Sequence, residues 1–285
     1  MRVLLLAAVV VAGVLVRSPA AETERVGGWI VYWRESPFPS IWAVRPNGTR
    51  NHRILRSRQN AKRPRLSQDR AWVAFDGAPP GKPPLSDFDI QLVRRNGRDR
   101  RTLTSSSDWD IDAQWSPDGQ WLSFTRSPPS PLDCTDHSIW IVRRDGSDAR
   151  RVAEGCAARW SPDGTKLIYV STDRRNLLVV DAAGGAPQLL LPGPARAYDK
   201  PAGWSPDRNK ILFTRSNGQN GYVYVMNADG TRVRRLSRGF AGSWSPDGKK
   251  ILYTGTFWWG LFVMNADGSH KHRILATEAS QPDWR

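Results

Sequence analysis

The sequence predicts an all-β protein, a six-bladed β-propeller closed by one C-terminal strand that joins three N-terminal strands. Three observations predict this fold. A five-residue motif recurs at near-regular spacing, each copy is followed by short apolar runs bounded by glycine turns, and the last copy is followed by no further run. The 285 residues are 39% hydrophobic and 10% aromatic, so the chain can bury a sizeable core and is not expected to be disordered.

The recurring motif is Trp-Ser-Pro-Asp-Gly, in which Pro presets φ and Gly takes the left-handed conformation of a tight hairpin. Its full, variant and degenerate copies, with the C-terminal tryptophan, are Leu66–Arg70, Trp115–Gly119, Trp160–Gly164, Trp204–Arg208, Trp244–Gly248 and Trp284. The steps from Leu66 to Trp284 are 49, 45, 44, 40 and 40 residues, a period typical of propeller blades. We expect the repeat tryptophans, with Leu66 once, to wedge between neighbouring blades.

Each copy ends one strand and precedes three more. The next two strands are continuous apolar runs, such as Ile211–Phe213 and Val223–Met226, which are typical of strands buried on both faces. A glycine turn, here Asp229-Gly230, then leads to a segment of alternating polar and apolar residues such as Arg234–Ser237. Such a segment is typical of an outer edge strand, on which charge discourages pairing with another sheet.

The two ends of the chain are expected to complete one blade together. Gln281–Arg285 supplies its inner strand, and Trp29–Tyr32, Ile41–Val44 and His52–Leu55 supply the other three. Ring closure of this kind removes exposed inner edges. We therefore expect a single propeller domain at 21–285, with blades at approximately 26–64 plus 280–285, 65–110, 111–156, 157–200, 201–240 and 241–279.

The Trp-Ser-Pro-Asp-Gly repeats and the Val-Met-Asn-Ala-Asp-Gly repeats at Val225–Gly230 and Val263–Gly268 resemble the TolB-type, WD-repeat-like β-propeller family. The resemblance covers about Val26 to Arg285 and implies a six-bladed ring. TolB carries an α/β domain before its propeller, whereas only a few residues here precede the first predicted strand. The resemblance therefore implies a free-standing relative that lacks this domain.

Residues 1–20 are interpreted as a signal peptide. A basic start is followed by the apolar stretch Val3–Val16 and by small residues at Ser18 and Ala20, which suits cleavage after Ala20. The alternative is a membrane anchor, but 14 apolar residues are short for a bilayer core. Cleavage removes two arginines and lowers the formal net charge from +15 to +13. We expect a periplasmic or extracellular protein with no membrane span after cleavage.

Strand order assigns the loops to two faces of the ring. The Ser-Pro-Asp-Gly and Asn-Ala-Asp-Gly hairpins lie on one face, called here the hairpin face. The loops between second and third strands and the loops between blades lie on the opposite face, called here the irregular face. The longest loops, about Asp76–Asp89 and Arg126–Ser138, lie there, and functional residues tend to occupy such loops.

Acidic residues concentrate on the irregular face. They are Asp87, Asp89, Asp108, Asp110, Asp112, Asp133 and Asp136, beside His137. Clustered carboxylates suit a hard divalent cation. The alternative, which we favour, is a set of solvated loop acids, because the glycine and the distal Glu of an EF-hand loop are missing. We expect no cofactor, with a divalent cation as the alternative.

Aromatic residues and the two cysteines map to the same face. Trp33, Phe38, Trp109, Trp258 and Trp259 are candidates to stack on a sugar or to anchor a partner. The alternative is that Trp258 or Trp259 begins the following strand and faces its neighbour. Cys134 and Cys156 are expected to form a disulfide, because export favours pairing and the topology places both on this face.

The positive charge is expected elsewhere, on the outer rim near the hairpins between third and fourth strands. Its residues are Arg94, Arg95, Arg98, Arg100, Arg101, Arg143, Arg144, Arg150, Arg151, Arg232, Arg234 and Arg235. This rim could bind anionic envelope polymers, or it could serve edge protection and solubility, which we favour. An exported chain without a recognition module is not expected to bind nucleic acid.

The sequence contains no Gly-x-Ser-x-Gly elbow and no phosphate-binding glycine loop, so enzyme signals are thin. We predict a monomeric binding module, without catalysis, for a protein or an anionic envelope polymer. Its candidate binding face comprises Trp33, Phe38, Asp87, Asp89, Trp109, Asp110, Asp133, Asp136, His137, Trp258 and Trp259. The alternative is a metal-dependent lyase or hydrolase that uses the acidic mouth of this face.

Overall fold

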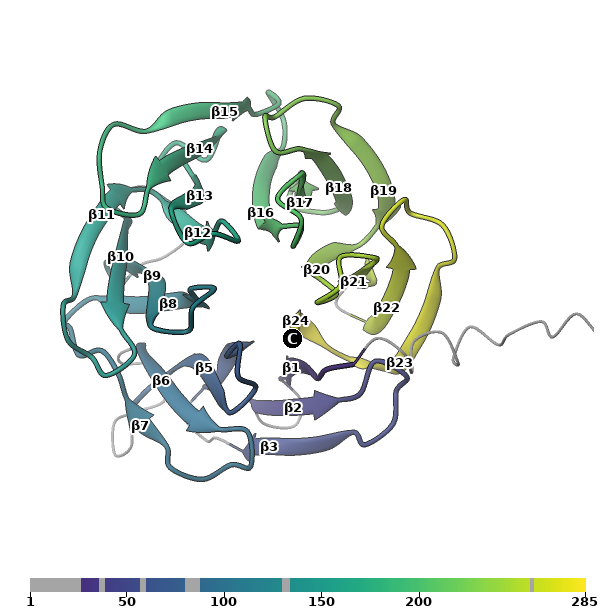
Figure 1. Cartoon of the computed structure of the whole chain (residues 1–285), viewed down its shortest axis with the longest axis horizontal. Helices are drawn as coiled ribbons and strands as arrows, with labels where there is room; N and C mark the ends of the chain where they lie inside the picture. Colours follow the sequence, from purple (N-terminus) through teal and green to yellow (C-terminus); the bar gives the residue numbers. More distant parts are fainter. Residues whose placement is uncertain (1–26, 36–38, 57–59, 80–87, 130–133, 257–258) are drawn as a thin grey trace, which may run out of the picture.

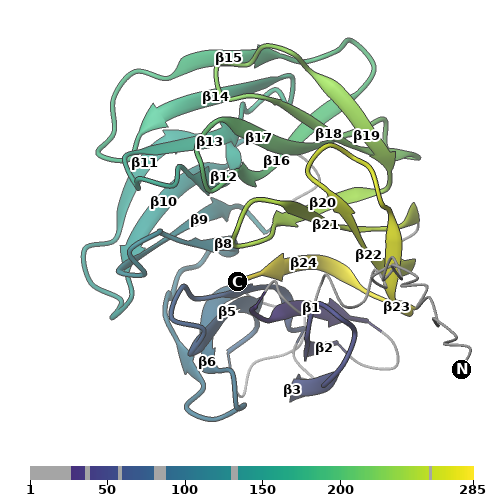
Figure 2. The ribbon, with the colours of Figure 1, turned by 45° about the vertical axis from the view of Figure 1, so that its right-hand side comes forward.

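The computed structural model describes residues 27–35, 39–56, 60–79, 88–129, 134–256 and 259–285. These residues form six antiparallel four-stranded sheets, which are arranged as the blades of a ring (Figure 1). Among them there is no α-helix, and hence no helix of the length and apolarity that a membrane span needs. Figure 2 shows the sheets side by side around the ring. The predicted all-β, six-bladed propeller is confirmed.

Within each blade the strands run outward from the ring centre. Blade one consists of β24 (Ser280–Trp284), β1 (Ile30–Arg34), β2 (Ser40–Val44) and β3 (His52–Arg56). Blade two consists of β4 (Lys62–Leu66), β5 (Trp72–Gly77), β6 (Asp89–Arg94) and β7 (Arg101–Thr102). Blade three consists of β8 (Trp109–Trp115), β9 (Trp121–Ser127), β10 (Ser138–Arg143) and β11 (Arg150–Glu154).

The remaining three blades repeat this order. Blade four consists of β12 (Cys156–Trp160), β13 (Lys166–Val170), β14 (Asn176–Asp181) and β15 (Gln188–Pro192). Blade five consists of β16 (Tyr198–Trp204), β17 (Lys210–Ser216), β18 (Gly221–Asn227) and β19 (Arg234–Arg238). Blade six consists of β20 (Phe240–Trp244), β21 (Lys250–Thr254), β22 (Trp259–Asn265) and β23 (His272–Glu278).

Ring closure occurs in blade one as predicted. Strand β24 pairs antiparallel with β1, with Trp284 opposite Ile30 and Asp283 opposite Val31. The backbones of Trp29 and Arg285 exchange two further hydrogen bonds, of 2.7 and 3.0 Å. Trp284 is fully buried, so the last strand of the chain is part of the core.

The repeat tryptophans tie each blade to the one before it. The indole Nε1 of Trp115 donates to the carbonyl of Arg65 at 3.0 Å, and that of Trp160 donates to the carbonyl of Gln114 at 3.2 Å. Trp244 makes the same contact with Gly203 at 3.3 Å. In each case the acceptor directly precedes the previous copy of the motif residue, so the wedge position predicted from the repeat is confirmed for these three.

The hydrophobic core is divided among the blade interfaces. Six clusters of buried side chains each join two neighbouring blades. One of them brings Ile90 and Leu92 of blade two against Trp115 and Phe124 of blade three. A central strand therefore buries both of its faces, which explains its unbroken apolar sequence.

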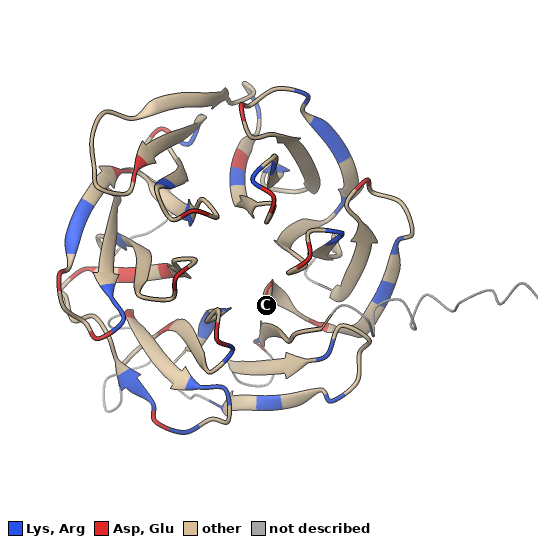
Figure 3. Cartoon of the chain, viewed as in Figure 1, with Lys and Arg blue, Asp and Glu red and all other residues tan. Residues whose placement is uncertain are grey.

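Arginines at the strand ends stack on tryptophans. The guanidinium of Arg45 lies 4.1 Å from the ring centre of Trp29, and that of Arg143 lies 4.6 Å from Trp121. In such contacts the planar guanidinium group lies over the face of the indole ring. Figure 3 shows that Lys and Arg also occur on inner strands near the ring centre, where the acids are close to them.

Candidate functional site

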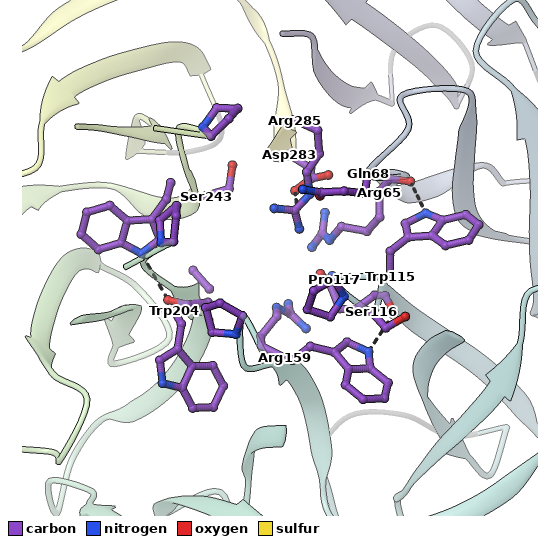
Figure 4. A pocket seen from close by; sticks show the side chains of 18 of the residues that line it. Arg65, Gln68, Trp115, Ser116, Pro117, Arg159, Trp204, Ser243, Asp283 and Arg285 are labelled. Atoms are coloured by element: carbon purple, nitrogen blue, oxygen red, sulfur yellow. Dashed lines mark hydrogen bonds and ion pairs between the residues drawn. The ribbon is translucent and has the colours of Figure 1, made fainter. Parts of the chain in front are cut away.

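The six inner strands deliver one residue per blade to the ring centre. This is the residue before each repeat Trp or Leu66, and the six are Arg65, Gln114, Arg159, Gly203, Ser243 and Asp283. All six line a cavity of about 290 Å³ on the hairpin side of the ring, called here the central cavity (Figure 4). Side chains alternate along a strand, so while the tryptophan reaches the blade interface its neighbour reaches the centre.

A β-bulge just upstream aims a second set of residues inward. The pairing register shifts between Ile111 and Gln114 in β8 and between Lys62 and Arg65 in β4. Asp112 sits in the first of these bulges with φ of 56°, a conformation that Asp tolerates better than most residues. Its backbone N–H donates to both carboxylate oxygens of Asp76 at 3.0 Å, which fixes the bulge.

Three cations from three blades converge on the carboxylate of Asp112. Arg65 of β4 lies 3.6 Å from it, Arg159 of β12 lies 3.3 Å away, and Lys200 of β16 lies 3.4 Å away. Asp112, Arg65 and Arg159 are all buried. These four side chains are called here the central charge cluster. Its members are up to 135 residues apart in the sequence.

The other acids near the centre have cations of their own. Asp76 pairs with Arg63 at 2.6 Å, and Asp283 lies 3.9 Å from Arg285. Asp199 accepts two hydrogen bonds of 2.7 Å from a single arginine of the neighbouring strand. The central charge cluster is therefore left with three positive groups and one negative group.

The pKa values of the cluster reflect this excess of positive charge. Burial lowers the pKa of Lys200 to about 8, with a contribution from the positive charges of Arg159, Arg63 and Arg65 that Asp112 opposes. Burial alone would raise the pKa of Asp112, but the surrounding cations outweigh it and hold the pKa well below its usual range. Burial and the charge of Arg159 also lower the pKa of Arg65.

The central cavity continues toward the irregular face. Arg65 and Arg159 also line a second cavity of about 240 Å³, together with Lys200 and Phe240. Lys200 in turn lines a third cavity of about 220 Å³, beside His137 and the two cysteines. The central charge cluster thus lies between the two faces of the ring.

Three of the acids predicted on the irregular face, Asp89, Asp110 and Asp112, are buried, so the interpretation of the whole set as solvated loop acids is wrong for these three. Arg126 donates two hydrogen bonds, of 2.8 and 2.9 Å, to the carboxylate of Asp110. Asp89 and His137 are buried, whereas Asp136 is exposed. Phe38, Asp87, Asp133 and Trp258 lie outside the described residues.

The predicted aromatic residues occupy two separate regions of the irregular face. Trp259 of blade six is 58% exposed. In the sheet it pairs with Glu278 of β23. The carboxylate of Glu278 accepts a hydrogen bond from the backbone N–H of Glu35, which directly follows strand β1 and is two residues from Trp33. Trp109, by contrast, lies in blade three and packs edge-on against Phe88. Trp33 and Trp259 are therefore in adjoining blades, and Trp109 is apart from them.

Cys134 and Cys156 form a disulfide with Cα atoms 5.6 Å apart. It connects the loop before β10 in blade three to the start of β12 in blade four. Within the described part of the chain, the one group of three potential metal ligands close together is this pair with His137. Both sulfurs are bonded to each other, so the group offers no thiolate to a metal.

The central charge cluster was not identified as a site from the sequence. The sequence pattern places Asp112 among the loop acids of the irregular face and assigns no role to Arg65, Arg159 or Lys200. The signal was nevertheless present, because the residue before each motif tryptophan must face away from the blade interface if the tryptophan faces toward it.

Comparison with known proteins agrees with this architecture. Residues 149–283 match the family model described as the TolB beta propeller domain. TolB from Acinetobacter baumannii has a similar structure, with a TM-score of 0.75 and 20% identity over 91% of this chain and 67% of that one. A chain of a nidogen/laminin complex gives a TM-score of 0.69 at 14% identity, over 90% of this chain and 98% of that one.

An oligogalacturonate lyase in complex with manganese is also similar, with a TM-score of 0.59 and 12% identity over 88% of this chain and 75% of that one. At such identities these structures share the fold with this chain. The family match agrees with the resemblance predicted from the motifs. The protein is therefore a six-bladed β-propeller whose residues 149–283 carry the pattern of the TolB beta propeller domain.

Proposed function

We propose that this protein is an exported binding module that docks a protein partner on the irregular face of its ring. The TolB-like propeller supports a binding role. The similar chain from the nidogen/laminin complex comes from an assembly of two proteins, which supports a protein as the partner. Propellers present loops from several blades on one face, and such a rigidly held set of loops suits docking.

The observation that carries this proposal is the exposure of Trp259. It is 58% exposed at the start of β22, and among the described residues the other large hydrophobic side chains that are exposed are the aliphatic Leu189 and Val233. An exposed tryptophan offers a large apolar area with one polar hydrogen-bond donor, and such residues dominate the energetics of protein interfaces.

Polar groups surround this aromatic region as they surround the centre of a protein interface. Glu278 lies opposite Trp259, and Lys62 lies 3.7 Å from Glu35 and over the ring of Trp33 at 5.2 Å. A central aromatic side chain with a charged rim matches the anatomy of protein–protein interfaces. A stretch of anionic polymer would instead call for unpaired cations here.

The test compares Trp259→Ser with Leu189→Ser in capture of proteins from an envelope fraction of the source organism. Leu189 is a matched control because it is 61% exposed, on the outer strand β15. We expect a partner that the wild type and Leu189→Ser retain and that Trp259→Ser loses by about tenfold or more, as for a hot-spot residue. Equal retention by both variants would contradict the proposed docking region.

Export is the second part of the proposal, and it rests on the predicted signal peptide and on the disulfide. The mass of the protein recovered from outside the cytoplasm should correspond to a chain that begins at Ala21. Alkylation without reduction should modify neither Cys134 nor Cys156, because both are bonded to each other. An uncut chain with two reactive thiols would contradict export.

The alternative, a metal-dependent lyase or hydrolase, needs carboxylates available to a metal. Asp110, a central member of the predicted acidic mouth, accepts hydrogen bonds on both carboxylate oxygens from Nε and Nη2 of Arg126. Its carboxylate is thus already engaged, and we therefore favour the binding role. Metal analysis of the purified protein separates the two. A stoichiometric divalent metal that is lost on Asp110→Asn would favour the enzyme.

A further inference from the structure

We propose that the central charge cluster is the binding site for a small dianionic oxyanion, a phosphate or dicarboxylate group. Arg65, Arg159 and Lys200 would hold the anion. This site lies inside the ring, so the inference stands apart from the docking of a protein on the irregular face. It is carried by the balance of charge, by the geometry of the contacts and by unpaired donors in the adjoining central cavity, which shares Arg65 and Arg159 with the cavity that Lys200 lines.

The charge balance leaves room for two negative charges. Asp112 is the carboxylate that Arg65, Arg159 and Lys200 share, whereas the neighbouring acids Asp76 and Asp283 have other cationic partners. Arg65 and Arg159 are buried and the side chain of Lys200 is 37% exposed, and buried charges in proteins are normally compensated. An anion of two charges would restore the balance that one carboxylate cannot.

The distances show that Asp112 satisfies none of the three cations closely. The contacts from Arg159 and Lys200 to its carboxylate are 3.3 and 3.4 Å, and that from Arg65 is 3.6 Å. Charge-assisted hydrogen bonds are ordinarily about 2.7 to 2.9 Å long. Such bonds do form elsewhere in this ring, for example between Arg215 and Asp199 at 2.7 Å.

Unpaired donors line the central cavity beside the two arginines. The side-chain Nε2 of Gln114 is buried and has no hydrogen-bond partner among the described residues, and Gln114 itself is only 6% exposed. The Nε of Arg285, which lines the same cavity, also has no partner in that part of the chain. Both atoms donate hydrogen bonds, so they call for an acceptor such as an oxyanion.

The size of the site limits the ligand to a small group. All three cations line the cavity of about 240 Å³, which shares Arg65 and Arg159 with the central cavity of about 290 Å³. Figure 4 shows the side chains of Arg65 and Arg159 reaching into the same space from different strands. Pockets for drug-sized ligands begin at about 300 Å³. A phosphate ion or a short dicarboxylate fits this range.

The test is calorimetric titration of the mature chain with inorganic phosphate, succinate and acetate, near neutral pH and low salt. We expect saturable binding of phosphate or succinate and weaker binding of the monoanion acetate. Lys200→Gln should lower the affinity by about tenfold or more, since a hydrogen bond to a charged group is lost. Lys249→Gln removes the same charge from an exposed position of blade six and should bind like the wild type.

The preferred probe identifies the source of the anion. Tighter binding of phosphate would indicate a phosphorylated ligand, and tighter binding of succinate would indicate a dicarboxylate. If neither binds, or if Lys200→Gln and Lys249→Gln bind equally, the proposal is wrong. Its failure leaves the capture experiment with Trp259→Ser unaffected, because that experiment concerns another part of the molecule.

A second variant gives a readout that misfolding cannot imitate. Asp112→Asn removes the resident carboxylate and keeps a residue that tolerates the positive φ at this position. We expect its melting temperature to fall without phosphate and to rise more on addition of phosphate than that of the wild type, because the added anion then compensates all three cations. An equal rise in the two proteins would overturn the assignment.

Discussion

At the scale of single residues, position within the repeat decides the environment of each side chain. Asp110 and Asp112 are two residues apart, yet Asp110 forms a closed pair with Arg126 while Asp112 is shared among three cations. The intervening bulge explains the difference, because it breaks the simple alternation of the strand and directs Asp112 to the ring centre.

Lys200 gives a pH dependence with a defined sign. Its pKa falls from 10.5 in the unfolded chain to about 8 in the folded protein, so between these values the unfolded chain holds more protons. Stability is therefore expected to rise with pH across this window, and the cost of the charged lysine is fully present below pH 8. Asp112, whose pKa is held well below its usual range, stays ionised throughout this window.

The measurement is urea unfolding of the wild type and Lys200→Met at about pH 7 and about pH 9.5. The stability of the wild type relative to Lys200→Met should increase at the higher pH, because the variant has nothing to deprotonate at this site. A difference between the two proteins that stays constant with pH would contradict the lowered pKa.

At the scale of elements, the motif hairpin is a local structure that each copy builds in the same way. The Ser245 hydroxyl donates to Asp247 at 2.6 Å and accepts from the backbone N–H of Lys250 at 2.9 Å. Gly248 closes the turn with φ of 71°. Because all of these contacts lie within six residues, the sequence alone predicted the hairpins.

Ser245→Ala tests this hairpin. Ser245 is fully buried, so the substitution leaves the Lys250 N–H without its acceptor and should lower the free energy of unfolding by about 1 to 3 kcal/mol. Ser269→Ala, in the hairpin between β22 and β23, is the control, because its hydrogen bond to Asp267 is exposed and water can replace it. Urea unfolding of both variants makes the comparison, and equal losses would contradict the assigned role.

The arginine-rich outer strands pack on tryptophans of neighbouring strands as well as forming the rim. The alternating, arginine-rich segments were correctly expected at the outer rim, and their charge was attributed to edge protection or polymer binding. In the structure Arg94 and Arg101 both lie over Trp72, at 4.7 and 5.5 Å. The sequence could not show this packing, because it depends on which strand ends lie side by side.

At the scale of the whole molecule, the C-terminal strand holds the ring closed. Trp284 packs with Ile30 of blade one and with Leu252 and Leu261 of blade six, so it connects the first blade of the ring to the last. The neighbouring Asp283 accepts the backbone N–H of Leu66 at 2.9 Å, which ties the same strand to blade two.

Trp284→Ala should therefore lower the free energy of unfolding by about 3 to 5 kcal/mol, as expected for a fully buried large side chain. Truncation after Ser280 removes the strand pairing as well and should destabilise the ring further. Trp259→Ala is the control, because that side chain is largely exposed. Thermal and urea unfolding provide the measurement. If the truncated chain melted like the complete one, closure by β24 would be contradicted.

The sequence by itself determined the number of blades, the hairpins and the chain ends that meet, because turn chemistry and strand periodicity act over a few residues and recur in every copy. Only the tertiary structure decided that Arg65, Asp112, Arg159 and Lys200 share one site. Their meeting requires the bulges and the closed ring, which bring inner strands from four blades to a common centre. Long-range electrostatics of this kind depends on distance in space, which spacing along the chain does not reveal.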